Sequence, residues 1–176
     1  MGMKSLLAAM LLVGCASEPD VTEPLLSETT NELAFDLVDS AGDGAFTIDV
    51  HAQTITGYRF ELIEGGRLCR REATVTSMGE RMAPLQAELD ATTLLTLGED
   101  SCAAAQAGCG GAFDHDLGVS VDGGLRYSPA TTCRVLQESS ALESALLAAF
   151  DAAAGPSQLV EFDGDSYTVL GDCPIH

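Results

Sequence analysis

The chain has 176 residues, the length of one ordinary domain, and carries 27 Asp and Glu against 8 Lys and Arg, a formal charge of −19. Hydrophobic residues make up 46% of the sequence, which is typical of a globular protein and excludes a largely disordered chain. The acidic charge argues against nucleic acid as a partner, because binding phosphates requires clustered Lys and Arg.

The N-terminal residues have the features of an export signal. A single Lys, Lys4, precedes an unbroken apolar run from Leu6 to Val13. This run is far shorter than the roughly 20 residues that span a bilayer. A positive charge, a short apolar segment and a small residue after it are typical of a secretory signal peptide. The sequence therefore predicts a signal peptide over residues 1–14.

The signal ends in Leu12-Val13-Gly14-Cys15, which resembles the lipobox of bacterial lipoproteins at every position. The resemblance implies a diacylglyceryl group on the sulfur of Cys15, cleavage before this residue and acylation of the new N-terminus. Two or more acyl chains are enough for stable membrane anchoring. Residue 16 is Ala rather than the Asp that retains such proteins at the inner membrane. The resemblance thus implies a bacterial cell-envelope location, with the outer membrane favoured. The alternatives are an ordinary cleaved signal or an N-terminal core helix.

Cleavage before Cys15 would remove the only Lys and leave seven Arg against 27 acids, a charge of −20. Anionic lipid repels such a body, so the lipid anchor rather than a basic patch must hold it at the membrane. Residues 15–30 contain two Pro and four acids with little periodicity, and we expect them to form a flexible tether. A single globular domain is expected over residues 31–176.

Alternation of apolar and polar residues dominates the start of this domain. It predicts one strand through Leu33, Phe35 and Leu37 and another through Phe46 and Ile48, joined by a turn-rich loop at 39–44. That loop partly resembles a calcium-binding loop, but its third position is Ala and its twelfth is Val, so two ligands are missing. A hairpin loop is the favoured interpretation.

A second hairpin is predicted to turn at Gly65-Gly66. A two-residue turn would place Glu61 opposite Arg70 and Arg59 opposite Glu72, so that opposite charges face each other across the strands. The reverse face would then be apolar and would contain Tyr58, Phe60, Leu62, Cys69, Ala73 and Val75. Arg71 would be the exception on that face, either as a snorkelling edge residue or as a cation that faces a ligand.

Two helices are expected. Residues 80–91 place Met82, Leu85 and Leu89 on one side, with a Pro in the first turn. The second helix starts at the capping box of Ser140 and Glu143 and stops at Gly-Pro, residues 155–156.

The remaining segments read as hairpins. A strand from Leu117 is predicted to turn near Gly123-Gly124 into a strand at 125–135, and the chain ends with a hairpin around Asp163-Gly164. We therefore predict an α+β fold, a mostly antiparallel sheet built from hairpins with two helices packed on one face.

Five cysteines remain if Cys15 is lipidated: Cys69, Cys102, Cys109, Cys133 and Cys173. An exported chain meets an oxidising compartment, so at least one disulfide is expected, while the odd count leaves one thiol over. The predicted register after Gly123-Gly124 brings Cys133 near Cys109, and this pair is the favoured disulfide. No Cys pair has the two to four intervening residues typical of zinc ligands, so no metal or cofactor is expected.

Catalytic signals are weak. The common nucleophile, metalloprotease and nucleotide-binding motifs do not occur in the sequence. His115 is flanked by Asp114 and Asp116, but no nucleophile can be assigned to it, and adjacent residues of a strand point to opposite faces. No catalytic residue is therefore predicted.

These observations favour a cell-envelope lipoprotein of non-catalytic role, as a binding, adhesion or structural module. The alternative is a lipid-anchored hydrolase that uses a pair of its many carboxylates. A pocket with converging acids and His would favour the hydrolase, and a filled sheet would favour the binding module.

Overall fold

The computed structural model describes residues 21–39, 42–97, 115–127, 134–137, 139–163 and 166–174. The strands, in chain order, are β1 (Val21–Pro24), β2 (Glu32–Asp39), β3 (Gly42–Asp49), β4 (Thr54–Ile63), β5 (Arg67–Ser77), β6 (Thr93–Thr96), β7 (His115–Val121), β8 (Gly124–Tyr127), β9 (Arg134–Leu136), β10 (Gln158–Asp163) and β11 (Ser166–Asp172). The helices are η1 (Gly79–Arg81), α1 (Met82–Ala91) and α3 (Ser139–Ala153).

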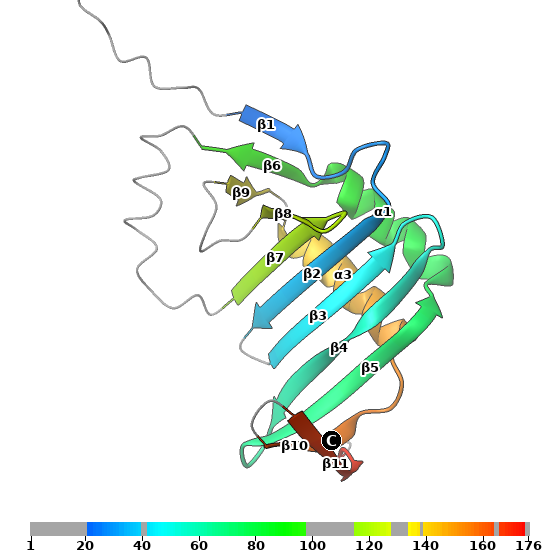
Figure 1. Cartoon of the computed structure of the whole chain (residues 1–176), viewed down its shortest axis with the longest axis vertical. Helices are drawn as coiled ribbons and strands as arrows, with labels where there is room; N and C mark the ends of the chain where they lie inside the picture. The colour runs from blue at the N-terminus through cyan, green and yellow to red at the C-terminus, as the bar shows by residue number, and fades with distance from the viewer. Residues whose placement is uncertain are drawn as a thin grey trace, which may run out of the picture.

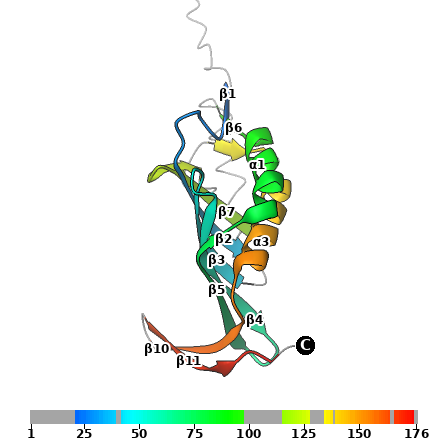
Figure 2. The ribbon, with the colours of Figure 1, turned by 90° about the vertical axis from the view of Figure 1, so that its right-hand side faces the viewer.

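The strands form two sheets in which neighbours pair antiparallel (Figure 1). The large sheet has the order β11-β10-β5-β4-β3-β2-β7-β8, and the small sheet has the order β1-β6-β9. Both α1 and α3 lie on the same side of the large sheet (Figure 2). This confirms the predicted antiparallel sheet with two helices. The sheet is large enough that the domain is α+β or mainly β.

The core fills the space between the large sheet and the helices. Helix α1 buries Met82, Leu85 and Leu89, the residues predicted from their spacing. Helix α3 buries its apolar stripe, and the ring of Phe150 meets that of Phe46 edge-on at 4.8 Å between centroids. The sheet contributes the alternate residues of its central strands, among them Leu33, Phe35, Leu37, Ile48, Ile55, Leu117 and Val119.

The first predicted hairpin is confirmed. Strand β2 pairs with β3, and Phe35 lies opposite Phe46. The two strands are longer and the loop between them is shorter than predicted, because β2 reaches Asp39 and β3 begins at Gly42. Asp43, one residue of the broken calcium-loop pattern, therefore belongs to β3, where it pairs with Val38.

The predicted register of the second hairpin is wrong by one residue. Ile63 pairs with Arg67, and the N–H of Gly66 donates to the carbonyl of Ile63 at 3.2 Å. The loop therefore has three residues, and its two glycines take φ values of +81° and +72° that favour glycine. Glu61 consequently lies opposite Cys69 rather than Arg70. A bulge at the far end restores the predicted pairing, with Ile55 opposite Thr76.

A shift of one residue exchanges the faces of a strand. Tyr58, Phe60 and Leu62 therefore share a face with Leu68, Arg70 and Glu72, whereas Cys69 and Ala73 lie on the helix side. Val75 is an exposed bulge residue rather than part of an apolar face. We call the face of the large sheet opposite the helices the outer face.

Arg71 takes neither of the two roles considered for it. It faces the helix side opposite Arg59, and its Nη1 lies 2.5 Å from Oδ1 of Asp151 in α3. Its Nη2 also donates to the carbonyl of Asp151 at 3.2 Å. This residue joins β5 to the last turns of α3.

The predicted strand at 125–135 is in fact two strands in different sheets. Strand β8 pairs with β7 and ends at Tyr127, whereas β9 pairs with β6. The turn lies at Asp122-Gly123, both in the left-handed region, and Val121 pairs with Gly124. The register from which the Cys109–Cys133 disulfide was inferred is therefore not the one observed, and both cysteines lie outside the described residues.

The folded domain begins earlier than the predicted boundary at Asn31. Strand β1 pairs with β6, and Leu25, whose N–H donates to the carbonyl of Thr92 at 3.1 Å, is buried in the core. The tether prediction is therefore wrong for residues 21–30. Residues 1–20, including Cys15, lie outside the described part of the chain.

Candidate binding site on the outer face

A second group of apolar side chains gathers on the outer face, where β4, β5, β10 and β11 meet. These strands place Phe60 opposite Arg70, Leu68 opposite Val160, and Phe162 opposite Tyr167. The sequence predicted the hairpin that holds this last pair, around Asp163-Gly164. We define the outer-face cluster as Tyr58, Phe60, Leu62, Leu68, Arg70, Val160, Phe162, Tyr167 and Val169.

Phe60 is at the centre of the aromatic contacts in this cluster. Its ring centroid lies 5.2 Å from that of Tyr58, 5.1 Å from Phe162 and 6.2 Å from Tyr167. The planes are tilted or edge-on, as the positive edge and negative face of aromatic rings prefer. The four rings therefore support one another and hold a fixed surface.

The cluster encloses one cation, Arg70. Its guanidinium carbon lies 4.7 Å from the ring centroid of Tyr167 and 5.3 Å from that of Tyr58, and its side chain is only 10% exposed. It forms an ion pair with Glu72, while its Nε has no hydrogen-bond partner in the described structure. The ring faces and the carboxylate offset part of the cost of removing this charge from water.

The rim of the cluster is open to solvent. Tyr58 is 37% exposed, Phe162 46% and Leu62 58%, which is far more than the buried core side chains. A cavity of about 310 Å³ lies beside it, lined by residues of the β4–β5 loop and of the last hairpin, among them Leu68, Phe162 and Leu170. A contiguous exposed apolar surface with polar residues around it is characteristic of an interaction site.

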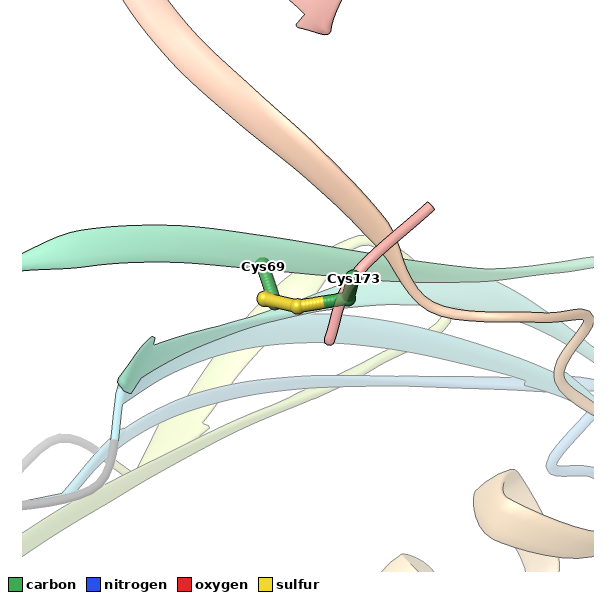
Figure 3. The surroundings of a disulfide bond; sticks show 2 residues. All are labelled: Cys69 and Cys173. Atoms are coloured by element: carbon green, nitrogen blue, oxygen red, sulfur yellow. A yellow bond between two sulfur atoms is a disulfide. The ribbon is translucent and has the colours of Figure 1, made fainter. Parts of the chain in front are cut away.

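A disulfide fixes the last hairpin beside the cluster. Cys69 of β5 is bonded to Cys173, which directly follows β11, with 5.9 Å between their Cα atoms (Figure 3). The N–H of Cys173 also donates to the carbonyl of Ser157 at 3.0 Å. Towards the hairpin tip, β10 and β11 extend to the side away from the helices (Figure 2). The expectation of a disulfide is confirmed, although its partners differ from the favoured pair.

The two histidines of the described structure lie at opposite ends of β2, since His51 contacts Asn31 before this strand and His115 pairs with Asp39 at its end. The exposed His51 has Nε2 3.0 Å from Oδ1 of Asn31. His115 begins β7, while Asp114 and His176 lie outside the described residues. Nowhere among the described residues do three His, Cys, Asp or Glu lie close enough to hold a metal ion.

The cavities do not gather acids either. Three cavities among the described residues are each lined by a single acidic residue, Glu161, Glu61 or Glu23. Glu23 is engaged with Arg126 at 3.3 Å and Arg134 at 3.9 Å, which ties β1 to β8 and β9. This arrangement joins the small sheet to the large one.

The carboxylate of Asp122 stabilises the backbone at the start of β2. One of its oxygens accepts the N–H groups of Asn31 and Glu32, both at 2.9 Å. These two hydrogen bonds lower the pKa of the Asp122 carboxyl below its usual value, and the one from Glu32 has the larger effect. Its charge thus fixes the start of β2 against the β7–β8 turn.

Comparison of the chain with protein-family models, with curated proteins and with solved structures found no match. Within the described residues, no helix has the length and apolar character needed to cross a membrane.

Proposed function

We propose that the protein is a lipoprotein of the bacterial cell envelope whose folded domain is a non-catalytic binding module. The lipobox at Leu12–Cys15 supports the anchor, and Ala16 favours the outer membrane. The outer-face cluster supports the binding role, because it exposes fixed aromatic rings on a face that no described helix covers.

The observation that carries the binding role is the arrangement around Arg70. A nearly buried cation among half-exposed rings costs stability in a domain that already has a separate apolar core. Such an arrangement is typical of recognition surfaces, where Arg and Tyr are enriched. The hydrolase alternative has no matching observation, because three cavities among the described residues are each lined by a single carboxylate residue.

The anchor is tested by metabolic labelling in a Gram-negative host that is fed a labelled fatty acid. The full chain should take up the label and fractionate with the outer membrane, whereas Cys15→Ala should remain unlabelled and be either released or uncleaved. Cys173→Ala is the matched control, since it removes a different cysteine and should keep the label. An unlabelled wild type, together with a Cys15→Ala variant that stays at the membrane at mature size, would refute the lipoprotein proposal.

A further inference from the structure

Strand β11 has a free edge in the described structure. It is the terminal strand of the large sheet, and among the described residues it pairs only with β10. All seven of its residues are exposed. The backbone N–H and C=O groups along the other side of such a strand are a template for another extended chain.

The edge also lacks the features that usually prevent pairing. Natural edge strands are blunted by Pro, by Lys or by inward-pointing charges, or they are kept very short. Strand β11 has no Pro and no basic residue, and its single charge, Asp172, is at its end. The bulge at Leu170 lies near the same end, so the stretch from Ser166 to Val169 is regular.

The two faces of β11 differ in chemistry. Tyr167 and Val169 lie on the outer face and continue the outer-face cluster. Ser166 and Thr168 lie on the other face, where their partners in β10 are the exposed acids Asp163 and Glu161. Alternate strands of a sheet are about 9–10 Å apart, which is within reach of an Arg or Lys side chain. An added strand would therefore meet apolar rings on one face and carboxylates on the other.

The charge of the protein indicates which kind of partner binds the free edge of β11. A second copy would bring a further charge of −19 to a surface that is already acidic, and repulsion opposes that pairing. A basic segment is attracted by the same charge. We propose that β11 binds a partner in extended conformation by strand addition, through a segment in which apolar and basic residues alternate. This inference rests on the proposed binding function and names its ligand class.

The test uses the full chain and a capped nine-residue peptide of alternating Arg and Val, titrated at low salt by calorimetry. Binding tighter than about 1 mM is expected, and a peptide with Glu in place of Arg should not bind in this range. Amide hydrogen exchange, followed by NMR, should slow in β11 when the Arg–Val peptide is present.

Two matched variants locate the site. Thr168→Lys places an amine beside Glu161 and should weaken peptide binding about threefold to fivefold, since like charges across strands cost up to about 1 kcal/mol. Thr74→Lys makes the same change of charge on β5, outside the segment that pairs with β10, and should leave the affinity unchanged. Failure of the Arg–Val peptide to bind, equal binding of the Glu peptide, or equal effects of the two Lys variants would overturn the inference.

The outcomes separate this inference from the proposed function. Peptide binding that slows exchange in β4 and β5 but not in β11 would overturn strand addition while supporting a binding module on the outer face. An unlabelled wild type, together with a Cys15→Ala variant that stays at the membrane at mature size, would refute the anchor whatever the peptide does.

Discussion

Removing the Cys69–Cys173 disulfide should destabilise the domain strongly, because the bond closes most of its chain. The two residues are 104 apart in sequence, and a cross-link over about 100 residues removes unfolded-state entropy equivalent to about 4.7 kcal/mol. Both side chains are buried, so alanine is the suitable replacement and introduces no unpaired hydroxyl. We expect the Cys69→Ala/Cys173→Ala variant to lose about 3–5 kcal/mol of unfolding free energy.

The assay is urea unfolding without reductant, followed by circular dichroism and by tyrosine fluorescence. The chain has no Trp, and one of its three Tyr, Tyr167, lies in the hairpin that the disulfide fixes. Both probes should give one transition for the wild type, and the variant should unfold at lower urea. A loss below about 1 kcal/mol would refute the reasoning.

Reductant added to the variant tests the separate prediction of a Cys109–Cys133 bond. That bond would close a loop of about 24 residues and contribute roughly 3 kcal/mol, so the variant should be destabilised further by reduction. If reductant does not change the stability of the variant, and the denatured variant shows three free thiols besides Cys15, the Cys109–Cys133 bond does not form.

Three further changes test the core, the backbone and the charge. Phe150→Ala should cost about 3–5 kcal/mol in urea unfolding, whereas Leu62→Ala, at a 58% exposed position, should change stability by less than about 0.5 kcal/mol. Gly57→Ala should lower the unfolding free energy by about 2–3 kcal/mol, because Gly57 has a φ of +152° and a Cβ there would lie 2.2 Å from a backbone oxygen. Gly123 has a φ of +76° and open space around it, so Gly123→Ala should lower the unfolding free energy by about 1 kcal/mol. Asp122→Asn keeps the acceptor oxygen but removes the charge. Because the folded pKa of Asp122 is lowered, its stabilisation is present above the unfolded pKa of about 3.9 and is lost as pH falls through the folded value. The stability gap between wild type and variant should therefore be constant above about pH 5 and shrink in acid, and a gap that widens in acid would contradict this assignment.

The elements with strong local patterns were predicted well. The capping box of Ser140 and Glu143 and the Gly-Pro stop were enough to predict the helix α3. The last hairpin, β10 with β11, was predicted from an Asp-Gly turn and alternating residues. In both cases the signal is contained within a few neighbouring residues, so no distant contact was needed.

The predictions that were wrong depended on distant contacts. A Gly-Gly pair fits a loop of two or three residues, and the observed register is the one that places Arg71 against Asp151 and Cys69 against Cys173. Alternation in β9 is the same whether it pairs with β7 or β6, so the sequence does not say which sheet it joins. The outer-face cluster was missed because of the wrong register in the β4–β5 hairpin. That register assigned Arg70 to the opposite face from Phe60.

Site-specific photocross-linking in intact cells tests the central claim most directly, namely that the face beside β11 receives a partner at the envelope. A photoreactive phenylalanine at Tyr167 keeps an aromatic ring in the outer-face cluster, and the same residue at Val75 probes an exposed apolar position in the β5 bulge. We expect a discrete adduct from position 167 in the membrane fraction, suppressed by the Arg–Val peptide, and none from position 75. Adducts from position 75 alone, or an adduct from 167 that the peptide leaves unchanged, would contradict the account.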